Sequence, residues 1–370
     1  MAGQLIRRGE RTWLIRVYRG RDAKGKREYV NRTVRGTKKE AERVLTKLLR
    51  DRDTGVLLEP SRESLAAYAP RWLSVWVKPR VRGRTFESYR WLLNKYVLPT
   101  LGARQLAQLS AADLQALYNS MTEAGYSSRT VRLTHTVVRS ALAHAVKTHL
   151  IVRNPADLTE PPRQQRREMQ ALGPAEAGRF LEAAKGDRWA ALWMLLVTAG
   201  LRPGEALGLK WADLDGAKLR IQRVRLPNGG VEEPKTARSR RVVTLPDLAV
   251  RALKEHKARQ NAEKLAAGRD YEDAGFIFVG PLGRPVETRS LVRHHFDRIV
   301  AAAGLPHLRL YDLRHTHATL LLAAGEHPKV VSERLGHSTV MLTLDTYSHV
   351  LPDMQTRAAE KLDAMLAGGR

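Results

Sequence analysis

Four short segments in the C-terminal half of the chain combine cationic side chains with histidine and tyrosine at predicted helix or turn boundaries. They centre on Arg202, on Lys235, on Tyr311 with Arg314, and on His337 with Tyr347. A guanidinium can grip two phosphate oxygens at once, and a histidine, or a lysine whose pKa is lowered, can exchange a proton near neutral pH. The set therefore suits electrostatic and acid–base work on an anionic substrate such as a phosphate.

The residues around Arg202 predict a stiff corner between two helices. An apolar helix runs to Gly200, and Pro203 suits the first turn of the next helix. Proline also keeps the residue before it out of helical conformation, so we expect Arg202 to be extended. Glu205 lies close enough along the chain to orient it. Taken alone, Arg202 is best interpreted as a helix-capping arginine paired with Glu205.

The other segments also have simple structural interpretations when each is taken alone. Lys235 sits at a predicted β-turn among cationic neighbours, like an ordinary surface lysine. Ser338 can cap a helix that carries Tyr347 as a core tyrosine. The helix predicted to begin near Tyr311 is polar in its first turn and becomes apolar only over residues 318–324. Such a polar start is unexpected for a helix that enters a core.

The order and spacing of these segments are more informative than any one of them. From Arg314 to His337 there are 23 residues, and from His337 to Tyr347 there are 10. The motifs are Gly-Leu-Arg-Pro-Gly-Glu around Arg202, Lys-Thr-x-x-Ser-x-Arg from Lys235 to Arg241, Leu-Arg-His-Thr from Leu313 to Thr316, Leu-Gly-His at 335–337, and Asp-Thr-Tyr-Ser-His from Asp345 to His349. With these five motifs in order, the chain resembles a tyrosine recombinase of the phage integrase family, and the resemblance extends over its whole length.

The resemblance implies a role for each matched residue in cutting and rejoining DNA. Arg202 and Arg314 would stabilise the charge at phosphorus, and His337 would donate a further hydrogen bond. Lys235, its pKa lowered by cationic neighbours, would protonate the leaving 5′-oxygen. Tyr347 would be the nucleophile and form a 3′-phosphotyrosyl bond. Because that bond stores the energy of the broken one, neither ATP nor any other cofactor is expected, and the sequence has no Gly-rich phosphate loop of the ATPase type.

One position departs from the family pattern. Three residues before the second arginine the family usually places a histidine, thought to assist proton transfer near the nucleophile, and this chain has Tyr311. A phenol with a pKa near ~10 is a poor base at neutral pH, but it can donate a hydrogen bond to a phosphate oxygen. We expect Tyr311 to do so, which leaves the general base unidentified. His315, although matched by the family, is interpreted as a structural residue that braces its helix, and His307 as a loop histidine.

The composition indicates a polyanionic partner and excludes several kinds of site. Lys and Arg outnumber Asp and Glu by 64 to 38 over 370 residues, a formal net charge of +26. Nucleic acid fits this excess better than a membrane surface, because neither end carries a basic amphipathic helix with bulky apolar anchors. The absence of cysteine excludes disulfides and thiolate sites. Carboxylates are scattered and no histidine pair has metal-binding spacing, so we predict no metal site and no metal catalysis.

The predicted elements divide the chain into three domains and a linker. They are residues 1–58, a small β-sheet plus helix; 62–158, a helical unit; 159–172, a Pro-rich linker; and 173–370, a mixed α/β unit. The predicted fold is therefore multidomain, mainly α with small β-sheets (α+β). Residues 1–50 hold 16 Lys or Arg against 5 Asp or Glu, which favours a nucleic-acid surface there. The resemblance implies an arm-type DNA-binding domain, a core-site DNA-binding domain and a catalytic domain, in that order.

Hydrophobic periodicity predicts the individual elements. Strands are expected at 13–18 and 27–34, followed by a helix that Thr37 caps. Helices are expected at 63–77, 85–98, 111–123, 128–149, 174–184, 189–199 and 203–209, strands at 218–226, 231–234 and 241–245, and a C-terminal helix at 353–366. The tryptophans of the helical unit are interpreted as core residues, and arginines are interleaved with them along the chain.

The expected partner is double-stranded DNA, bound at core and arm attachment sites by a homo-tetramer. An excision factor or a host DNA-bending protein is left open as a further partner, and the C-terminal helix either docks on a neighbouring protomer or packs on its own domain. The N-terminus lacks the apolar core of a signal peptide and no apolar run approaches a membrane span, so a cytoplasmic location in a bacterial host, on the nucleoid when DNA is bound, is expected. Two alternatives are a nicking-closing enzyme like the type IB topoisomerases and a catalytically silent DNA-binding regulator.

Overall fold

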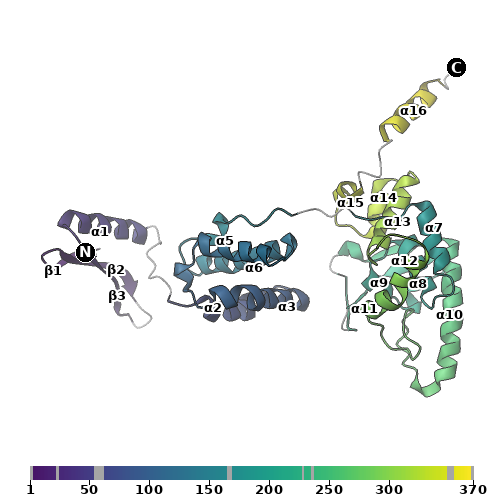
Figure 1. Ribbon diagram of the computed structural model, residues 1–370, viewed down its shortest axis with the longest axis horizontal. Coiled ribbons are helices and arrows are strands. Elements are labelled where there is room, and N and C mark those ends of the chain that lie inside the picture. Colours follow the sequence, from purple (N-terminus) through teal and green to yellow (C-terminus); the bar gives the residue numbers. More distant parts are fainter. Residues whose placement is uncertain are drawn as a thin grey trace. The chain divides into compact units, whose positions relative to one another are not determined.

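The computed structural model describes residues 3–21, 25–53, 62–164, 169–226, 229–234, 237–347 and 354–367. The chain divides into two compact units, residues 1–166 and residues 167–370. Helices dominate and the sheets are small (Figure 1), so the predicted multidomain, mainly α fold is confirmed. No helix within the described ranges is both long and apolar enough to cross a membrane.

A small antiparallel sheet with one helix against it opens the first unit. Its strands pair in chain order: β1 (Gly3–Gly9), β2 (Thr12–Arg21) and β3 (Arg27–Arg35). The helix α1 (Lys38–Asp53) packs against β1 and β2, as the ribbon shows (Figure 1). The strands near 13–18 and 27–34 and the helix are confirmed, but β1 was not predicted. Its side chains come in like pairs, Leu5-Ile6 and Arg7-Arg8, instead of alternating.

Helices make up the rest of the first unit. They are α2 (Leu65–Trp72), α3 (Gly83–Leu92), α4 (Leu98–Leu101), α5 (Ala111–Glu123) and α6 (Ser128–Lys147), with π-helical turns at Leu73–Val77 and Leu93–Val97 and 3-10 turns at Leu106–Gln108 and Pro155–Leu158. All four helices predicted here are confirmed, and the first two continue through the π-helical turns. Their apolar faces share one core.

Two of the tryptophans predicted to be core residues are not. Trp72 is buried, but Trp76 is 37% and Trp91 is 51% exposed. Arg80 lies over the Trp76 ring and Lys95 over the Trp91 ring. A cation held over an aromatic ring is a favourable contact at a surface, so these two rings have partners without being buried.

The second unit combines small sheets with ten α-helices among its described residues. The helices are α7 (Pro174–Ala183), α8 (Ala190–Ala199), α9 (Pro203–Leu207), α10 (Asp247–Ala267), α11 (Thr288–Leu291), α12 (Asp297–Ala302), α13 (Asp312–Ala323), α14 (Pro328–Leu335), α15 (Val340–Tyr347) and α16 (Met354–Ala367). One sheet contains β4 (Leu214–Asp215), β5 (Lys218–Ile221) and β8 (Arg241–Thr244), and the other contains β6 (Val224–Arg225) and β7 (Val231–Glu232). The prediction of one strand over 218–226 is wrong, because the chain leaves the first sheet at Gln222-Arg223, whose side chains bind the buried Asp213.

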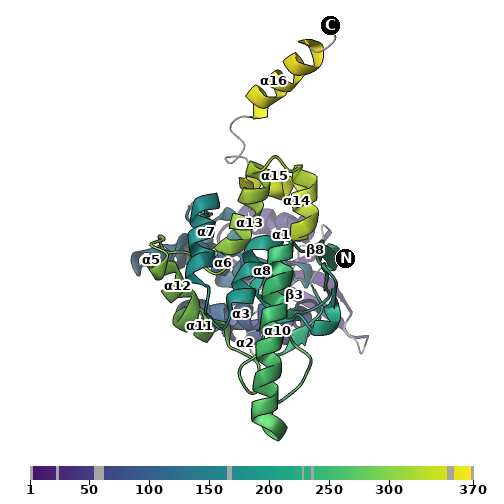
Figure 2. The ribbon, with the colours of Figure 1, turned by 90° about the vertical axis from the view of Figure 1, so that its right-hand side faces the viewer.

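Two apolar clusters hold this unit together and position its polar residues. The larger cluster surrounds α8, whose residues are almost all buried, with α7, α10 and α13 packed around it. The smaller cluster consists of Ala318, Leu322, Val331, Leu335 and Tyr347 and joins α13, α14 and α15. Figure 2 shows these three helices gathered together.

Candidate active site

The corner between α8 and α9 holds Arg202 as predicted. Gly200 ends α8 in the left-handed conformation, with φ 63°, and Arg202 is extended (φ −69°, ψ 145°) before Pro203. A Cβ at position 200 would collide with the ring of His317, so both the φ angle and the close packing require glycine. The Arg202 side chain remains 34% exposed, which leaves part of its guanidinium open to a ligand.

Glu205 is buried against two arginines. Its carboxylate accepts hydrogen bonds from Arg202 Nη1 at 2.6 Å, from the Arg202 backbone N at 3.0 Å and from Arg241 Nη2 at 3.0 Å. Burial by itself would raise the pKa of Glu205, but Arg241 and Arg202 together lower it below its ordinary value of 4.5. Arg241 also donates from Nε to the carbonyl of Arg334 at 2.5 Å, which ties β8 to α14. Glu205 therefore fixes Arg202 within a buried charge network.

Removing this carboxylate is expected to destabilise the fold strongly. Glu205→Ala leaves the Arg241 guanidinium buried without its counter-charge, which costs about 3–5 kcal/mol. Because the pKa of Glu205 is lowered in the folded chain, its contribution is present above pH 4.5 and is lost as the pH falls through the lowered pKa. Urea unfolding at neutral pH measures the loss. The control is Asp215→Asn in the exposed pair with Arg220, expected to cost less than about 1 kcal/mol, and equal losses would contradict the buried network.

Arg314 is the most deeply buried charge of the site. Its side chain is 1% exposed, and Nη1 and Nη2 donate to the carbonyls of Gly200 at 2.7 Å and Leu335 at 2.6 Å. These carbonyls lie at the C-terminal ends of α8 and α14, where the helix dipole favours a cation. Burial, reinforced by the neighbouring Arg202, lowers the pKa of Arg314 to about 10, so it stays charged at neutral pH. The two carbonyls use two of its five N–H donors and leave the others for an anion.

His337 follows α14 directly and is oriented by Thr343. Gly336 ends α14 in the left-handed conformation, with φ 68°. The His337 Nδ1 lies 2.8 Å from the hydroxyl of Thr343, a fully buried residue of α15. With Nδ1 engaged, Nε2 is the ring atom that can meet a ligand. Burial and then the nearby cations Arg314 and Arg202 lower the pKa of His337 to about 4, so the ring is neutral at neutral pH.

Tyr347 ends α15 with its ring in the core and its hydroxyl beside a histidine. The ring is 2% exposed and packs in the smaller apolar cluster. Its Oη lies 2.7 Å from Nδ1 of His315, a residue 32 positions earlier on α13. Burial raises the pKa of Tyr347 and Arg314 acts against that rise, so the hydroxyl is protonated before any reaction.

Tyr311 borders the same cluster at the start of α13. Its side chain is 42% exposed, and its ring meets the His315 ring edge-on at 5.3 Å between centroids. Its hydroxyl also lies near the Arg202 side chain. Burial lowers the pKa of Arg202, but Glu205 and, more weakly, Tyr311 raise it above its ordinary value.

Five of the six residues singled out from the sequence thus form one cluster: Arg202, Tyr311, Arg314, His337 and Tyr347. Lys235 lies outside the described residues, and so does His349 of the last motif. The sequence did not reveal three partners: Arg241 for Glu205, Thr343 for His337 and His315 for Tyr347. Thr343 carried a signal, since it precedes Tyr347 by four residues and shares its helix face. His315, interpreted as a brace for its helix, instead contacts the Tyr347 hydroxyl.

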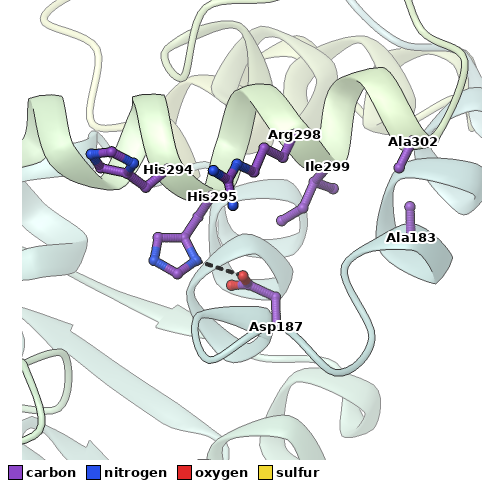
Figure 3. A pocket seen from close by; sticks show the side chains of 7 residues that line it. All are labelled: Ala183, Asp187, His294, His295, Arg298, Ile299 and Ala302. Atoms are coloured by element: carbon purple, nitrogen blue, oxygen red, sulfur yellow. Dashed lines mark hydrogen bonds and ion pairs between the residues drawn. The ribbon is translucent and has the colours of Figure 1, made fainter.

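A separate surface hollow lies beside α7 and α12. It is lined by Ala183, Asp187, His294, His295, Arg298, Ile299 and Ala302 (Figure 3). The Asp187 carboxylate lies 2.7 Å from His295 Nδ1 and also accepts a hydrogen bond from the Trp193 indole at 3.0 Å. Asp187 therefore links the segment that carries His295 to α8, which carries Trp193. None of the five clustered residues lines this hollow. Within the described part of the chain, no three or more His, Asp or Glu side chains gather as metal ligands would, and the expectation of no metal or cofactor stays a prediction.

Comparisons with known proteins agree on one family. The family model of the phage integrase family matches residues 170–354, and that of the phage integrase N-terminal SAM-like domain matches residues 64–122. The tyrosine recombinase XerC-like protein of Caldanaerobacter subterraneus subsp. tengcongensis is 30% identical over 97% of both chains. The integrase of Streptomyces ambofaciens is 30% identical over 94% of this chain and 92% of its own. The structure of the Tn1549 transposon integrase in complex with transposon right end DNA covers 81% of this chain and 99% of its own, with 23% identity and a TM-score of 0.68, which shows a shared fold.

Proposed function

Since the chain belongs to the phage integrase family and is a tyrosine site-specific recombinase, we propose that it cleaves and rejoins double-stranded DNA with the hydroxyl of Tyr347. The observation that carries this assignment is the position of that hydroxyl. It extends from a buried ring to His315 and lies within electrostatic reach of Arg314. A nucleophile held beside fixed cations is what attack on a phosphodiester requires.

In the proposed reaction, the Tyr347 oxygen attacks the scissile phosphorus and the surrounding cations stabilise the charge that develops. Arg314 is fixed by two carbonyls and Arg202 by Glu205, so their remaining N–H groups are oriented before the phosphate arrives. Preorganised donors of this kind need little rearrangement in the transition state. His337, with Nδ1 on Thr343, would donate from Nε2 to a further phosphate oxygen.

The leaving 5′-oxygen needs a proton, and we assign that role to Lys235. Its motif leads directly to Arg241, which contacts Glu205, so the two ends of the motif would serve one site. The phosphotyrosyl ester formed with Tyr347 keeps the energy of the broken bond. A 5′-hydroxyl from another strand can therefore reverse the attack and complete strand exchange without ATP.

Tyr311 would steady the phosphate instead of moving a proton, because its hydroxyl lies near Arg202 and a phenol is a poor base at neutral pH. Tyr311→Phe removes one hydrogen bond of about 1 kcal/mol, so cleavage should slow by about tenfold or less. Rates of covalent adduct formation measure the effect. An unchanged rate would make Tyr311 a spacer that only fills its position.

The three predicted domains would each contact DNA. The first domain, residues 1–58, would bind arm sites, and the second, residues 62–158, would bind the core site. The linker, residues 159–172, would join these two domains to the catalytic domain, residues 173–370. The basic charge of the first 50 residues supports the arm-site role, and the SAM-like family match at 64–122 supports the core-site role. Four protomers would complete two sequential exchanges on bacterial DNA in the cytoplasm, with an excision factor or host bending protein as a further partner.

Covalent capture tests this function and identifies the attachment site in the same experiment. The full chain is incubated with a pool of nicked duplexes of randomised sequence. When the protein cleaves close to the nick, the short strand between the cleavage site and the nick diffuses away, so the DNA cannot be rejoined and the covalent adduct is trapped. DNA that resists detergent and extraction is sequenced, which yields the core site. Complete absence of covalently bound DNA would refute the proposal.

A second measurement separates recombination from the two alternatives. Two duplexes that carry the captured site should yield recombinant joints. Relaxation of supercoiled DNA without any joints would indicate a topoisomerase-like enzyme, and non-covalent binding alone would indicate a silent regulator.

A further inference from the structure

His315 contacts the Tyr347 hydroxyl, but the proposed reaction so far gives it no task. Its Nδ1 lies 2.7 Å from the Tyr347 hydroxyl, a hydrogen bond between α13 and α15. Its ring is half-buried and lies 5.8 Å from the Tyr347 ring and 5.3 Å from the Tyr311 ring, centroid to centroid. A residue that only braced its own helix would not need to meet the reacting oxygen.

We propose that Nδ1 of His315 is the general base that takes the proton from the Tyr347 hydroxyl during cleavage and returns it during rejoining. The proposal rests on the proposed function, since it assigns a group to the same reaction. Tyr311, three residues before Arg314, cannot fill this task, because a phenol is a poor base at neutral pH.

The step balances with the groups at hand. As the bond between Tyr347 Oη and phosphorus forms, the Oη–H proton passes to His315 Nδ1 and the ring becomes an imidazolium. The bond between phosphorus and the 5′-oxygen breaks, and that oxygen takes a proton from Lys235. Rejoining runs in reverse: the attacking 5′-hydroxyl loses its proton to Lys235, and the departing Tyr347 oxygen recovers its proton from His315. No outside oxidant, reductant or metal is required.

The surroundings keep His315 ready to accept. Burial lowers the pKa of His315 to about 4; Asp312 opposes this effect, and Arg314 and Arg309 reinforce it. The ring is therefore neutral at neutral pH, and in the tautomer that carries its proton on Nε2 the Nδ1 lone pair can accept the Tyr347 proton. An incoming phosphate offsets the charge of these arginines, so binding DNA makes the imidazole a stronger base when the reaction needs it.

The neighbours also fix the geometry of the transfer. Tyr347 is anchored by its buried ring and His315 by its place on α13, whose Ala318 and Leu322 belong to the same apolar cluster as Tyr347. Tyr311 also packs edge-on against the imidazole and limits its rotation. The transfer distance is thus set by packed side chains on both helices.

The test compares adduct formation by the wild type and His315→Asn on the captured core site. The asparagine amide oxygen can occupy the place of Nδ1 and accept the Tyr347 hydrogen bond, but it cannot take the proton. We expect the cleavage rate to fall about 100-fold or more, the lower range for loss of a general base. The wild-type rate should decline on the acidic side as His315 becomes protonated, and the variant should lose that decline.

The controls keep this outcome distinct from failure of the proposed function. Wild-type protein must form adducts that Tyr347→Phe does not, and His307→Asn, at an exposed loop histidine, should react like the wild type. Thermal unfolding verifies that His315→Asn is folded, and His315→Gln replaces it if it is not. A rate within threefold of the wild type, or a slower rate that keeps the acidic decline, would overturn the proposal.

Discussion

Tyr347→Phe should abolish the covalent protein–DNA adduct while the chain remains folded and still binds DNA. The ring is 2% exposed in the apolar cluster of α13, α14 and α15, and phenylalanine fills the same space. Loss of the hydroxyl removes one hydrogen bond, the one to His315 Nδ1, so the free energy of unfolding should fall by about 1 kcal/mol. The loss of reaction should exceed about a thousandfold, because no other group can take the place of a covalent nucleophile.

Gel electrophoresis under denaturing conditions measures the adduct, and a native gel shift measures binding to the same duplex. The matched control is Tyr118→Phe, another buried tyrosine, whose hydroxyl has no hydrogen-bond partner among the described residues. That variant should keep both adduct formation and stability. An undiminished adduct with Tyr347→Phe would show that a different residue attacks the DNA.

The sequence was most informative where local rules decide the structure. Gly200 and Pro203 bracket Arg202, and their backbone preferences were sufficient to predict an extended arginine between two helices. The capping pair Thr37 and Glu40 likewise marked the start of α1. The order of the motifs then predicted that segments far apart in the sequence would share one site. The cluster of Arg202, Arg314, His337 and Tyr347 is consistent with that prediction.

Contacts set by tertiary packing could not be predicted in this way. His315 and Tyr347 meet because α13 and α15 pack through a shared apolar cluster, and no periodicity in either helix encodes that distance. The strand expected at 218–226 failed for a related reason, since the buried Asp213 draws Gln222 and Arg223 out of the ladder. Polar side chains that bind across the fold thus account for several of the missed features.

Replacement of Arg314 is the second change that we expect to have a large effect on DNA cleavage. The geometry of its guanidinium explains why a positive charge alone is insufficient at this position. Its guanidinium bridges the carbonyls of Gly200 and Leu335, so it closes the ends of α8 and α14 as well as facing the proposed phosphate. A lysine has a single nitrogen and cannot span both carbonyls and also present a fork to two phosphate oxygens. The positive charge would therefore remain while its orientation is lost.

Arg314→Lys should reduce adduct formation by about 10²–10³-fold, the usual loss when one preorganised donor group is removed from a charged transition state. Urea unfolding should show a smaller change of about 1–3 kcal/mol, because one buried carbonyl loses its partner. The gel shift should change little, since most phosphate contacts would come from the basic surface of the rest of the chain. Arg220→Lys, at a half-exposed arginine of β5, provides the control and should cleave normally. Near wild-type cleavage by Arg314→Lys would mean that the site requires only a positive charge at this position, and the bridging role assigned to the guanidinium would then be wrong.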